Sequence, residues 1–286
     1  MDDGNAEIRG GPDQRKKRIG DAFFYKLRTF VEISAAQIDC VQSLCHRETT
    51  LNPGSSVVRM GEPQDTVYVL NEGWAARYRV LNDGSRQVAN FILPGDFMSL
   101  NACIFPVSDY SISAITPIRI AHFTTAGIIH MTQLHPLLCA AMFWCNAREE
   151  AMLIEHLTNV GRRNAQQRVA HLLLELARRL ELSGQSVSGS HPDSLCFDMP
   201  LTQELIGDAL GLTNIHVNRT MRALEEDGLI KCGRQSGIRR VVIKNPVGLS
   251  ELSGFTDDYL HFAEIPQSTR RLLDTAERTR KTFAGE

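Results

Sequence analysis

The spacing of hydrophobic residues divides the chain into segments of different periodicity. In residues 22–45 apolar side chains recur every three or four positions, which predicts one or two short amphipathic helices. Over residues 48–123 short runs of β-branched and aromatic residues alternate with Gly, Pro, Asn and Asp, which is typical of strands joined by tight turns. Short strands at this spacing favour an antiparallel sandwich or barrel. The expected strands cover residues 57–60, 66–70, 75–80, 87–93, 111–115 and 118–123.

A long helix is expected after Pro136, because no Gly or Pro interrupts the chain again before Gly161. Its apolar residues form a stripe too broad for one contact, so the helix must be covered on two sides. We expect one side to pack on the β-rich region and the other to pair with the same helix of a second copy. A helix buried within one domain is the alternative. The side chains assigned to the contact between copies are Phe143, Ala147, Ala151, Ile154 and Leu157.

Residues 201–230 contain the most informative pattern. Thr202 can cap a helix over residues 203–210, Gly211 can adopt the left-handed conformation that ends it, and Thr213 can cap a second helix. The small Gly207 allows the two helices to cross closely. A very short turn between two such helices predicts a helix-turn-helix. The crevice between them would be filled by Ile206, Leu210, Leu212, Val217 and Leu224.

The second helix of such a unit enters the major groove of DNA, where Asn can pair with adenine and Arg with guanine or phosphate. Residues 229–232 and 239–243 predict two strands around a loop at 233–237, a wing that would lie against the DNA backbone. Residues 213–244 hold seven basic and three acidic side chains, although the whole chain carries a net charge of −2. The alternative is two core helices with an ordinary solvated basic face. The DNA-contacting candidates are Thr202, Thr213, Asn214, Ile215, His216, Asn218, Arg219, Arg222 and Arg234.

Length and composition agree with two globular domains. The chain has 286 residues, with 43% hydrophobic and 22% charged residues. Neither a stretch long enough to span a membrane nor a secretory signal is visible, so we expect a cytoplasmic protein without a membrane partner. The expected division is a flexible tail (1–20), a β-rich domain (21–135), a dimerisation helix (136–163), a DNA-binding domain (164–246) and a C-terminal extension (247–286).

The order of these segments resembles the Crp/Fnr family of bacterial regulators over about residues 24–244. The resemblance rests on Gly61-Glu62-Pro63, Tyr68-Val69-Leu70-Asn71-Glu72-Gly73, Asp83-Gly84, Pro94-Gly95-Asp96-Phe97 and the helix-turn-helix. Residues 211–230 resemble a subgroup with a His-Val-Asn-Arg-Thr recognition helix, and Phe255 with Tyr259 and Leu260 resembles its C-terminal extension.

The resemblance implies an α+β fold with three parts. These are an N-terminal antiparallel β-roll like a cyclic-nucleotide-binding jelly roll, a long dimerisation helix and a C-terminal winged helix-turn-helix. It also implies a homodimer on a two-fold symmetric site in double-stranded DNA, with RNA polymerase as a partner if the protein is an activator.

The effector is not identified by the sequence. Cyclic-nucleotide receptors of the family place a Glu toward the ribose, and an Arg with Ser or Thr toward the phosphate, just after the Gly-Asp-Phe turn. No Lys or Arg occurs between Arg86 and Arg119. Because a phosphate there would lack a cationic partner, we do not expect cyclic AMP to bind. An unidentified small molecule or no effector remain open, and the candidate pocket residues are Phe97, Leu100, Asn101, Ser108 and Asp109.

Seven irregularly spaced cysteines suit reduced thiols better than a disulfide framework. The oxygen-sensing members of the family ligate an iron–sulfur cluster, but Cys40 and Cys45 alone cannot fill its four positions, so we expect neither a cofactor nor a metal. Cys232 lies between Lys231 and Arg234, where a positive field would favour the thiolate. Cys232 is therefore a candidate for redox control of DNA binding.

Catalysis is not expected. A catalytic jelly roll needs several His and a Glu on its strands, and residues 47–121 contain no His. No phosphate-binding glycine loop or nucleophile elbow is present. The sequence predicts a DNA-binding regulator, and the alternative is a small-molecule or redox-sensing module without direct DNA contact. Salt-dependent DNA binding separates these two functions.

Overall fold

The structure is a computed structural model that describes residues 19–185, 187, 189, 193–235, 237–260, 267–269, 271, 272 and 275. The expected flexible tail therefore falls almost entirely outside the described residues. So do most of the C-terminal extension beyond Leu260 and part of the loop between residues 183 and 194.

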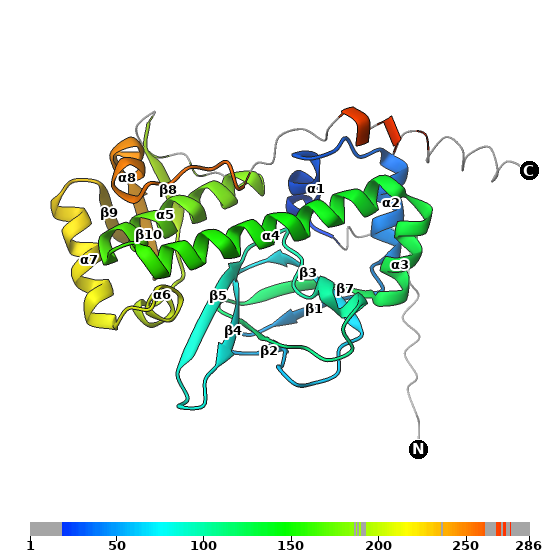
Figure 1. Cartoon of the computed structure of the whole chain (residues 1–286), viewed down its shortest axis with the longest axis horizontal. Coiled ribbons are helices and arrows are strands. Elements are labelled where there is room, and N and C mark those ends of the chain that lie inside the picture. The colour runs from blue at the N-terminus through cyan, green and yellow to red at the C-terminus, as the bar shows by residue number, and fades with distance from the viewer. Residues whose placement is uncertain are drawn as a thin grey trace, which may run out of the picture.

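Two antiparallel sheets form the β-roll (Figure 1). The three-stranded sheet has the order β1 (Arg47–Leu51), β7 (Ile118–Thr124), β3 (Thr66–Glu72). The four-stranded sheet has the order β2 (Ser56–Val58), β6 (Ser111–Ala114), β4 (Ala75–Val80), β5 (Arg86–Ile92). A cluster of buried apolar side chains from both sheets forms the core of the roll, and includes Leu70, Ile92, Ile112 and Ile120.

All six expected strands of the roll are confirmed, within a few residues at their ends. The sequence pattern missed β1, whose residues Arg-Glu-Thr-Thr-Leu contain one large apolar side chain. Backbone pairing with β7 holds this edge strand in place, from Arg47 opposite His122 to Leu51 opposite Ile118. Its identity as a strand is therefore set by a partner about 70 residues away along the chain.

Helices α1 (Asp21–Arg28), α2 (Ala35–Leu44) and α3 (Thr125–Leu134) and the 3₁₀ turn η1 (Leu100–Cys103) cover one end of the roll. Helix α1 lies directly against the turn at Gly95. A Cβ atom on Gly95 would lie 2.6 Å from the backbone oxygen of Ala22, and the φ of Gly95 is +86°. Both facts require glycine, which brings the neighbouring Asp96 close to α1.

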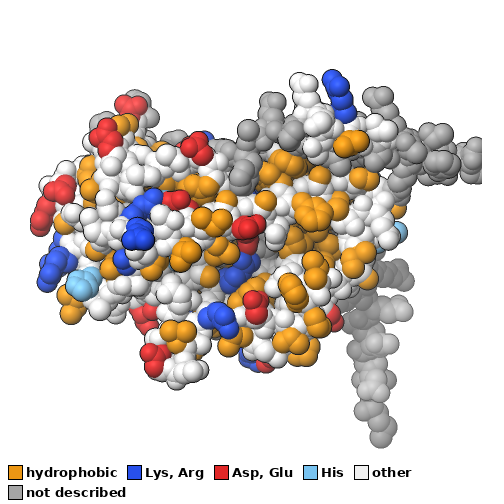
Figure 2. Space-filling view, viewed as in Figure 1, with side chains coloured by type: hydrophobic (Ala, Val, Ile, Leu, Met, Phe, Trp, Pro, Cys, Tyr) orange, Lys and Arg blue, Asp and Glu red, His pale blue; other side chains and the backbone are white. Residues whose placement is uncertain are grey.

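Helix α4 (Pro136–Arg162) runs across the whole molecule (Figure 1). One side buries Leu138, Met142 and Met152. The other side exposes Phe143 and Leu157, each 73% exposed, and Ile154, 60% exposed. Figure 2 shows hydrophobic side chains gathered on the face of the molecule across which α4 runs. The two-sided helix is thus confirmed on its inner side, and its outer side is open in a single chain.

The C-terminal unit contains α5 (Ala165–Leu182), α6 (Gln203–Leu210), α7 (Asn214–Glu226) and α8 (Pro246–Ser253). They pack on a sheet of order β8 (Leu195–Asp198), β10 (Ile238–Ile243), β9 (Ile230–Gln235). The two wing strands are longer than expected, because pairing continues to Gln235 opposite Ile238. The expected loop at 233–237 is therefore mostly strand.

The C-terminal unit rests on the β4–β5 side of the roll. Trp74, Val88 and Phe91 of the roll belong to the same apolar cluster as the cores of α5, α6 and α7. At the rim of this contact Arg86 of β5 forms an ion pair of 2.7 Å with Asp208 of α6. The position of the helix-turn-helix is thus tied to the roll by both apolar and ionic contacts.

No helix in the described ranges combines the length and the hydropathy that crossing a bilayer requires.

Candidate nucleic-acid interface and ligand cavity

Helix α6 begins and ends where the sequence predicts, and α7 begins at the predicted cap, Thr213. The Thr202 side chain accepts a hydrogen bond from the backbone N–H of Leu205 at 3.1 Å, and Thr213 accepts one from His216 at 3.3 Å. Gly211 ends α6 with a φ of +64°. These caps satisfy backbone groups that would otherwise lack partners at the start of each helix.

Gly207 fixes how closely the two helices approach. A Cβ atom at this position would lie 2.4 Å from the backbone oxygen of Leu212 in the turn. Four of the five expected crevice residues, all except the partly buried Leu212, are almost fully buried: Ile206, Leu210, Val217 and Leu224. The predicted helix-turn-helix is therefore confirmed in its caps, turn and packing.

The outer face of α7 is exposed and chemically varied. Ile215 is 72% exposed, and Arg219 and Arg222 are also exposed. A shallow recess is lined by Ile215, Asn218, Arg219, Arg222, Ala223 and Glu226. Nδ1 of His216 lies 3.1 Å from the Thr213 hydroxyl, so one ring nitrogen is engaged with the helix cap. The other ring nitrogen of His216, Nε2, is left to bind an outside partner.

A second recess joins the start of α6, the start of α7 and the wing. Three of the predicted contact residues line it, namely Thr202, Asn214 and Arg234, each from a different element. The nine predicted DNA-contacting residues thus occupy these two recesses and the Thr213 cap on the same helix-turn-helix unit, whose α7 lies at one end of the molecule (Figure 1).

The arginines of this surface differ in whether an acid neutralises them. Arg240 of β10 pairs with Asp198 at 3.3 Å. Arg219, Arg222 and Arg234 form no ion pair with any residue that the structure describes. Three guanidinium groups therefore face solvent in a form able to bind phosphate or base edges.

The environment of Cys232 is the opposite of the one expected from its basic neighbours. Burial raises the pKa of this thiol to about 11, with a further contribution from the Glu225 carboxylate. Strand alternation explains the error, because Lys231 is exposed whereas Cys232 is turned partly inward, beside Glu225. The expectation that a positive field favours its thiolate is wrong.

A cavity of about 300 Å³ lies between the roll and α4. Phe97, Leu100 and Asn101 line it as expected, whereas Ser108 and Asp109 do not. Ser108 is buried, with its hydroxyl donating to the backbone oxygen of Tyr110 at 2.9 Å, and Asp109 is exposed. In their place Tyr110 lines the cavity.

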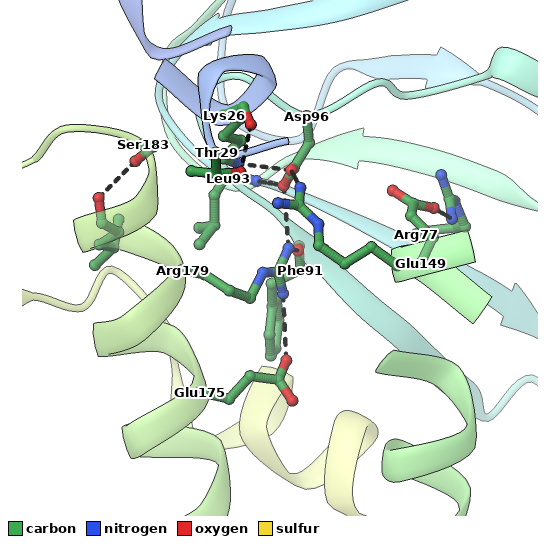
Figure 3. A network of polar contacts seen from close by, with 12 residues as sticks. Lys26, Thr29, Arg77, Phe91, Leu93, Asp96, Glu149, Glu175, Arg179 and Ser183 are labelled. Carbon is green, nitrogen blue, oxygen red and sulfur yellow. Dashed lines mark hydrogen bonds and ion pairs between the residues drawn. The ribbon is translucent and has the colours of Figure 1, made fainter. Parts of the chain in front are cut away.

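The cavity also contains cations that the sequence analysis missed. Arg77 of β4 and Arg148 of α4 both line it, with Glu149. Arg77 forms an ion pair of 2.5 Å with Glu149 (Figure 3). Its Cζ also lies 4.8 Å from the centre of the Tyr110 ring. Both arginines come from elements outside the segment that follows the Gly95-Asp96-Phe97 turn. The expectation that an anion in this pocket would lack a cationic partner is therefore wrong. The available signal was a charged pair, Arg148-Glu149, in the middle of a largely apolar helix.

Next to the cavity, one buried carboxylate joins several elements (Figure 3). Asp96 lies 2.6 Å from Lys26 Nζ of α1 and 3.0 Å from Arg179 Nη2 of α5. Its second oxygen also accepts from the backbone N–H of Leu93 at 2.9 Å, and Arg179 donates to the backbone oxygen of Phe91 at 2.7 Å. The roll, α1 and the C-terminal unit therefore meet at one side chain.

The charges of this cluster support one another. Burial alone would raise the pKa of Asp96, but Lys26, Arg179 and Arg148 together outweigh it and hold that pKa well below its ordinary value. Burial lowers the pKa of Lys26 to about 8, even though Asp96 partly offsets this effect. Asp96 is thus ionised at neutral pH, and its removal would leave buried cations without their counter-charge.

The start of the C-terminal extension packs on α5. The Tyr259 hydroxyl donates to Glu175 at 2.9 Å, and Asp257 pairs with Arg178 at 2.8 Å. Glu175 in turn lies 3.4 Å from Arg179. Residues far along the chain therefore connect through α5 to the carboxylate of Asp96.

The N-terminal and the C-terminal parts of the chain each match a known protein family. Residues 48–135 match the family described as the cyclic nucleotide-binding domain, and residues 167–252 match the Crp-like helix-turn-helix domain. The chain is 30% identical over 184 residues to the nitrogen fixation regulation protein FixK of Bradyrhizobium diazoefficiens, covering 64% of this chain and 74% of that protein.

Two further similarities point the same way. The chain is 32% identical over 181 residues to the transcriptional activatory protein AadR of Rhodopseudomonas palustris, covering 62% of this chain and 71% of that protein. The solved structure of FixK2 from Bradyrhizobium japonicum superposes with a TM-score of 0.63 at 26% identity, covering 73% of this chain and 98% of the other.

Proposed function

The chain belongs to the Crp/Fnr family of DNA-binding transcriptional regulators, and from this premise we propose that it binds a two-fold symmetric promoter site as a homodimer. The observation that carries the proposal is the exposed face of α7, where Arg219 and Arg222 lack a partner among the described residues and lie on the same unit as a basic wing.

Eight of the nine candidate side chains have the following chemically suitable partners in DNA. Asn214 and Asn218 suit adenine, Arg219 suits guanine, and Ile215 suits the thymine methyl group. Thr202, Thr213, Arg222 and Arg234 suit phosphates, which position the unit on the duplex. The segment His216-Val217-Asn218-Arg219-Thr220 supports membership of the subgroup with that recognition sequence.

The second copy would bind along α4. Phe143, Ile154 and Leu157 are mostly exposed in a single chain, and a stripe of this kind on a 27-residue helix needs a cover. The same stripe on another copy supplies a self-complementary one. The pairing would place two α7 helices about 34 Å apart, at successive major grooves.

We further propose that the protein acts without catalysing a reaction, and that it contacts RNA polymerase if it activates transcription. A signal would act through the cavity beside α4, because α4 contacts both the roll and the C-terminal unit. Cyclic AMP does not suit that cavity, since Leu100 stands where the resemblance would place a ribose-binding Glu.

In vitro selection of sites from a random DNA pool tests the proposal. The wild type should enrich a two-fold symmetric consensus, and Arg219→Ala should lose specific binding to it while its folding and dimerisation remain intact. Arg28→Ala, at an exposed position on α1, is the matched control and should bind as the wild type does. Unchanged operator affinity in Arg219→Ala would move the recognition surface elsewhere.

A further inference from the structure

Arg148 is a buried cation whose charge is poorly matched. It is 6% exposed, its nearest carboxylate oxygen is Asp96 Oδ1 at 3.6 Å, and its Nε has no hydrogen-bond partner among the described residues. Asp96 is already engaged by Lys26 and Arg179 at shorter distances. A buried guanidinium in this state is costly unless an anion completes its hydrogen bonds.

The guanidinium of Arg148 is held in place and faces the cavity. Its Cζ lies 4.8 Å from the centre of the Trp144 ring, a cation–π contact that restrains the group. The second arginine of the cavity, Arg77, is neutralised by Glu149 at 2.5 Å. Arg148, whose nearest acid is the shared Asp96 at 3.6 Å, is therefore the more weakly paired of the two arginines that line the cavity. Its planar fork can receive a carboxylate through two hydrogen bonds.

The remaining walls describe the rest of a ligand. Phe97, Leu100 and Leu153 supply apolar surface. The Tyr110 hydroxyl donates its hydrogen to Oδ1 of Asn101 at 2.7 Å, so these two side chains offer a ligand few further polar groups. The volume of about 300 Å³ is at the small end of ligand pockets.

We propose that this cavity binds a small monocarboxylate with an apolar body, whose carboxylate pairs with Arg148. The proposal rests on the proposed function and names the ligand class of its sensor. A second negative charge is disfavoured, because Asp96, Glu149 and Glu150 also line the cavity. A cyclic nucleotide is disfavoured, because its sugar hydroxyls would meet the apolar wall at Leu100.

The position of Arg148 connects ligand binding to the rest of the protein. Arg148 lies on α4 and also faces Asp96, which pairs with Arg179 of α5. A carboxylate on Arg148 would therefore complete a charge cluster that includes the sensor roll, α4 and the C-terminal unit. Leu153, which lines the cavity, is 40% exposed on the same helix as the proposed dimer stripe.

Calorimetry on the full-length protein in a carboxylate-free buffer tests the ligand class. The probes are benzoate, phenylacetate and octanoate, each compared with its neutral amide, and cyclic AMP. At least one acid should bind saturably and at least tenfold more tightly than its amide. Arg148→Gln should weaken that acid by roughly ten- to a hundredfold, the range for a hydrogen-bonded ion pair.

Two further variants keep the result interpretable. Arg148→Lys retains the charge near Asp96 but not the fork, so it should bind the acid with an affinity between wild type and Arg148→Gln. If Arg148→Gln fails to fold, Arg148→Lys alone must still show weakened binding. Arg162→Gln, an exposed arginine on the same helix, should bind the acid like the wild type.

Three results would overturn the proposal: no acid binding above its amide, Arg148 variants that bind the acid like wild type, or tight binding of cyclic AMP. Arg219→Ala separates this proposal from the DNA-binding one, because it should retain acid binding in full. If the wild-type protein binds an acid but selects no DNA consensus, the result counts against the proposed regulator function and not against the ligand proposal.

Discussion

The recognition surface on α6 and α7 and the cavity beside α4 use arginine in contrasting ways. On the recognition surface Arg219, Arg222 and Arg234 are exposed and have no ion-pair partner among the described residues. In and beside the cavity the partly buried Arg77 and the buried Arg179 are paired with acids from other elements. The difference shows that exposed charge is available for a partner such as DNA, whereas buried charge here joins the elements of the fold.

The largest expected effect comes from removing a buried charge beside the cavity. Asp96→Asn removes the carboxylate shared by Lys26 and Arg179, and should destabilise the protein by about 3–5 kcal/mol, because the buried cations lose their counter-charge. Urea unfolding measures the change. The control is Asp109→Asn, at an exposed position of the roll. Its stability should stay within about 0.5 kcal/mol of that of the wild type. Equal effects at the two positions would contradict the role given to Asp96.

Acid should reproduce part of that loss. The native pKa of Asp96 lies below the unfolded value of about 4, so its ionised form stabilises the fold above that value. This stability should be lost as the pH falls through the lower native pKa. Urea midpoints measured from pH 6 downward should therefore fall more steeply for wild type than for Asp96→Asn, and parallel curves would count against the prediction.

A methyl group at Gly207 should disturb the turn between α6 and α7. Gly207→Ala places a Cβ atom 2.4 Å from the Leu212 oxygen, so the turn must shift, at a cost of about 1–3 kcal/mol. Operator affinity should fall with it. Gly161→Ala on α4 is the matched control, since nothing lies within 4 Å of its Cβ position, and alanine there should stabilise the helix by up to about 1 kcal/mol.

Tyr259→Phe should have a smaller effect on the link between the C-terminal extension and α5. It removes the hydrogen bond to Glu175 and should cost about 1 kcal/mol, measured by thermal unfolding. Tyr25→Phe, at a tyrosine that is 52% exposed, should be neutral. A neutral Tyr259→Phe would show that the extension contributes nothing through this contact.

The smallest expected effect concerns a phosphate contact on the recognition surface. Arg234→Ala should lower the slope of log affinity against log salt by about 1, without changing the preferred DNA sequence. Binding isotherms at several salt concentrations measure this slope. A changed consensus would instead place Arg234 on a base edge.

The same contrast decides what could be predicted from the sequence. The recognition surface is one continuous segment, so its caps, turn and exposed residues follow from local rules at Thr202, Gly211 and Thr213. The cavity is assembled from β4, the turn after β5 and α4. Arg77 and Arg148 were missed because only the fold brings them together, and Ser108 and Asp109 were wrong because Ser108 binds the backbone of the turn.

The cluster around Asp96 also has a consequence for synthesis of the protein. Asp96 and Arg179 are 83 residues apart, so at 5–20 residues per second the ribosome needs about 4–17 s to make the partner of a carboxylate already translated. During that interval Lys26 is available to Asp96, while Arg179 is not. The nascent roll thus passes through a stage with an incomplete interior, in which chaperones and proteases meet a looser chain than the finished one.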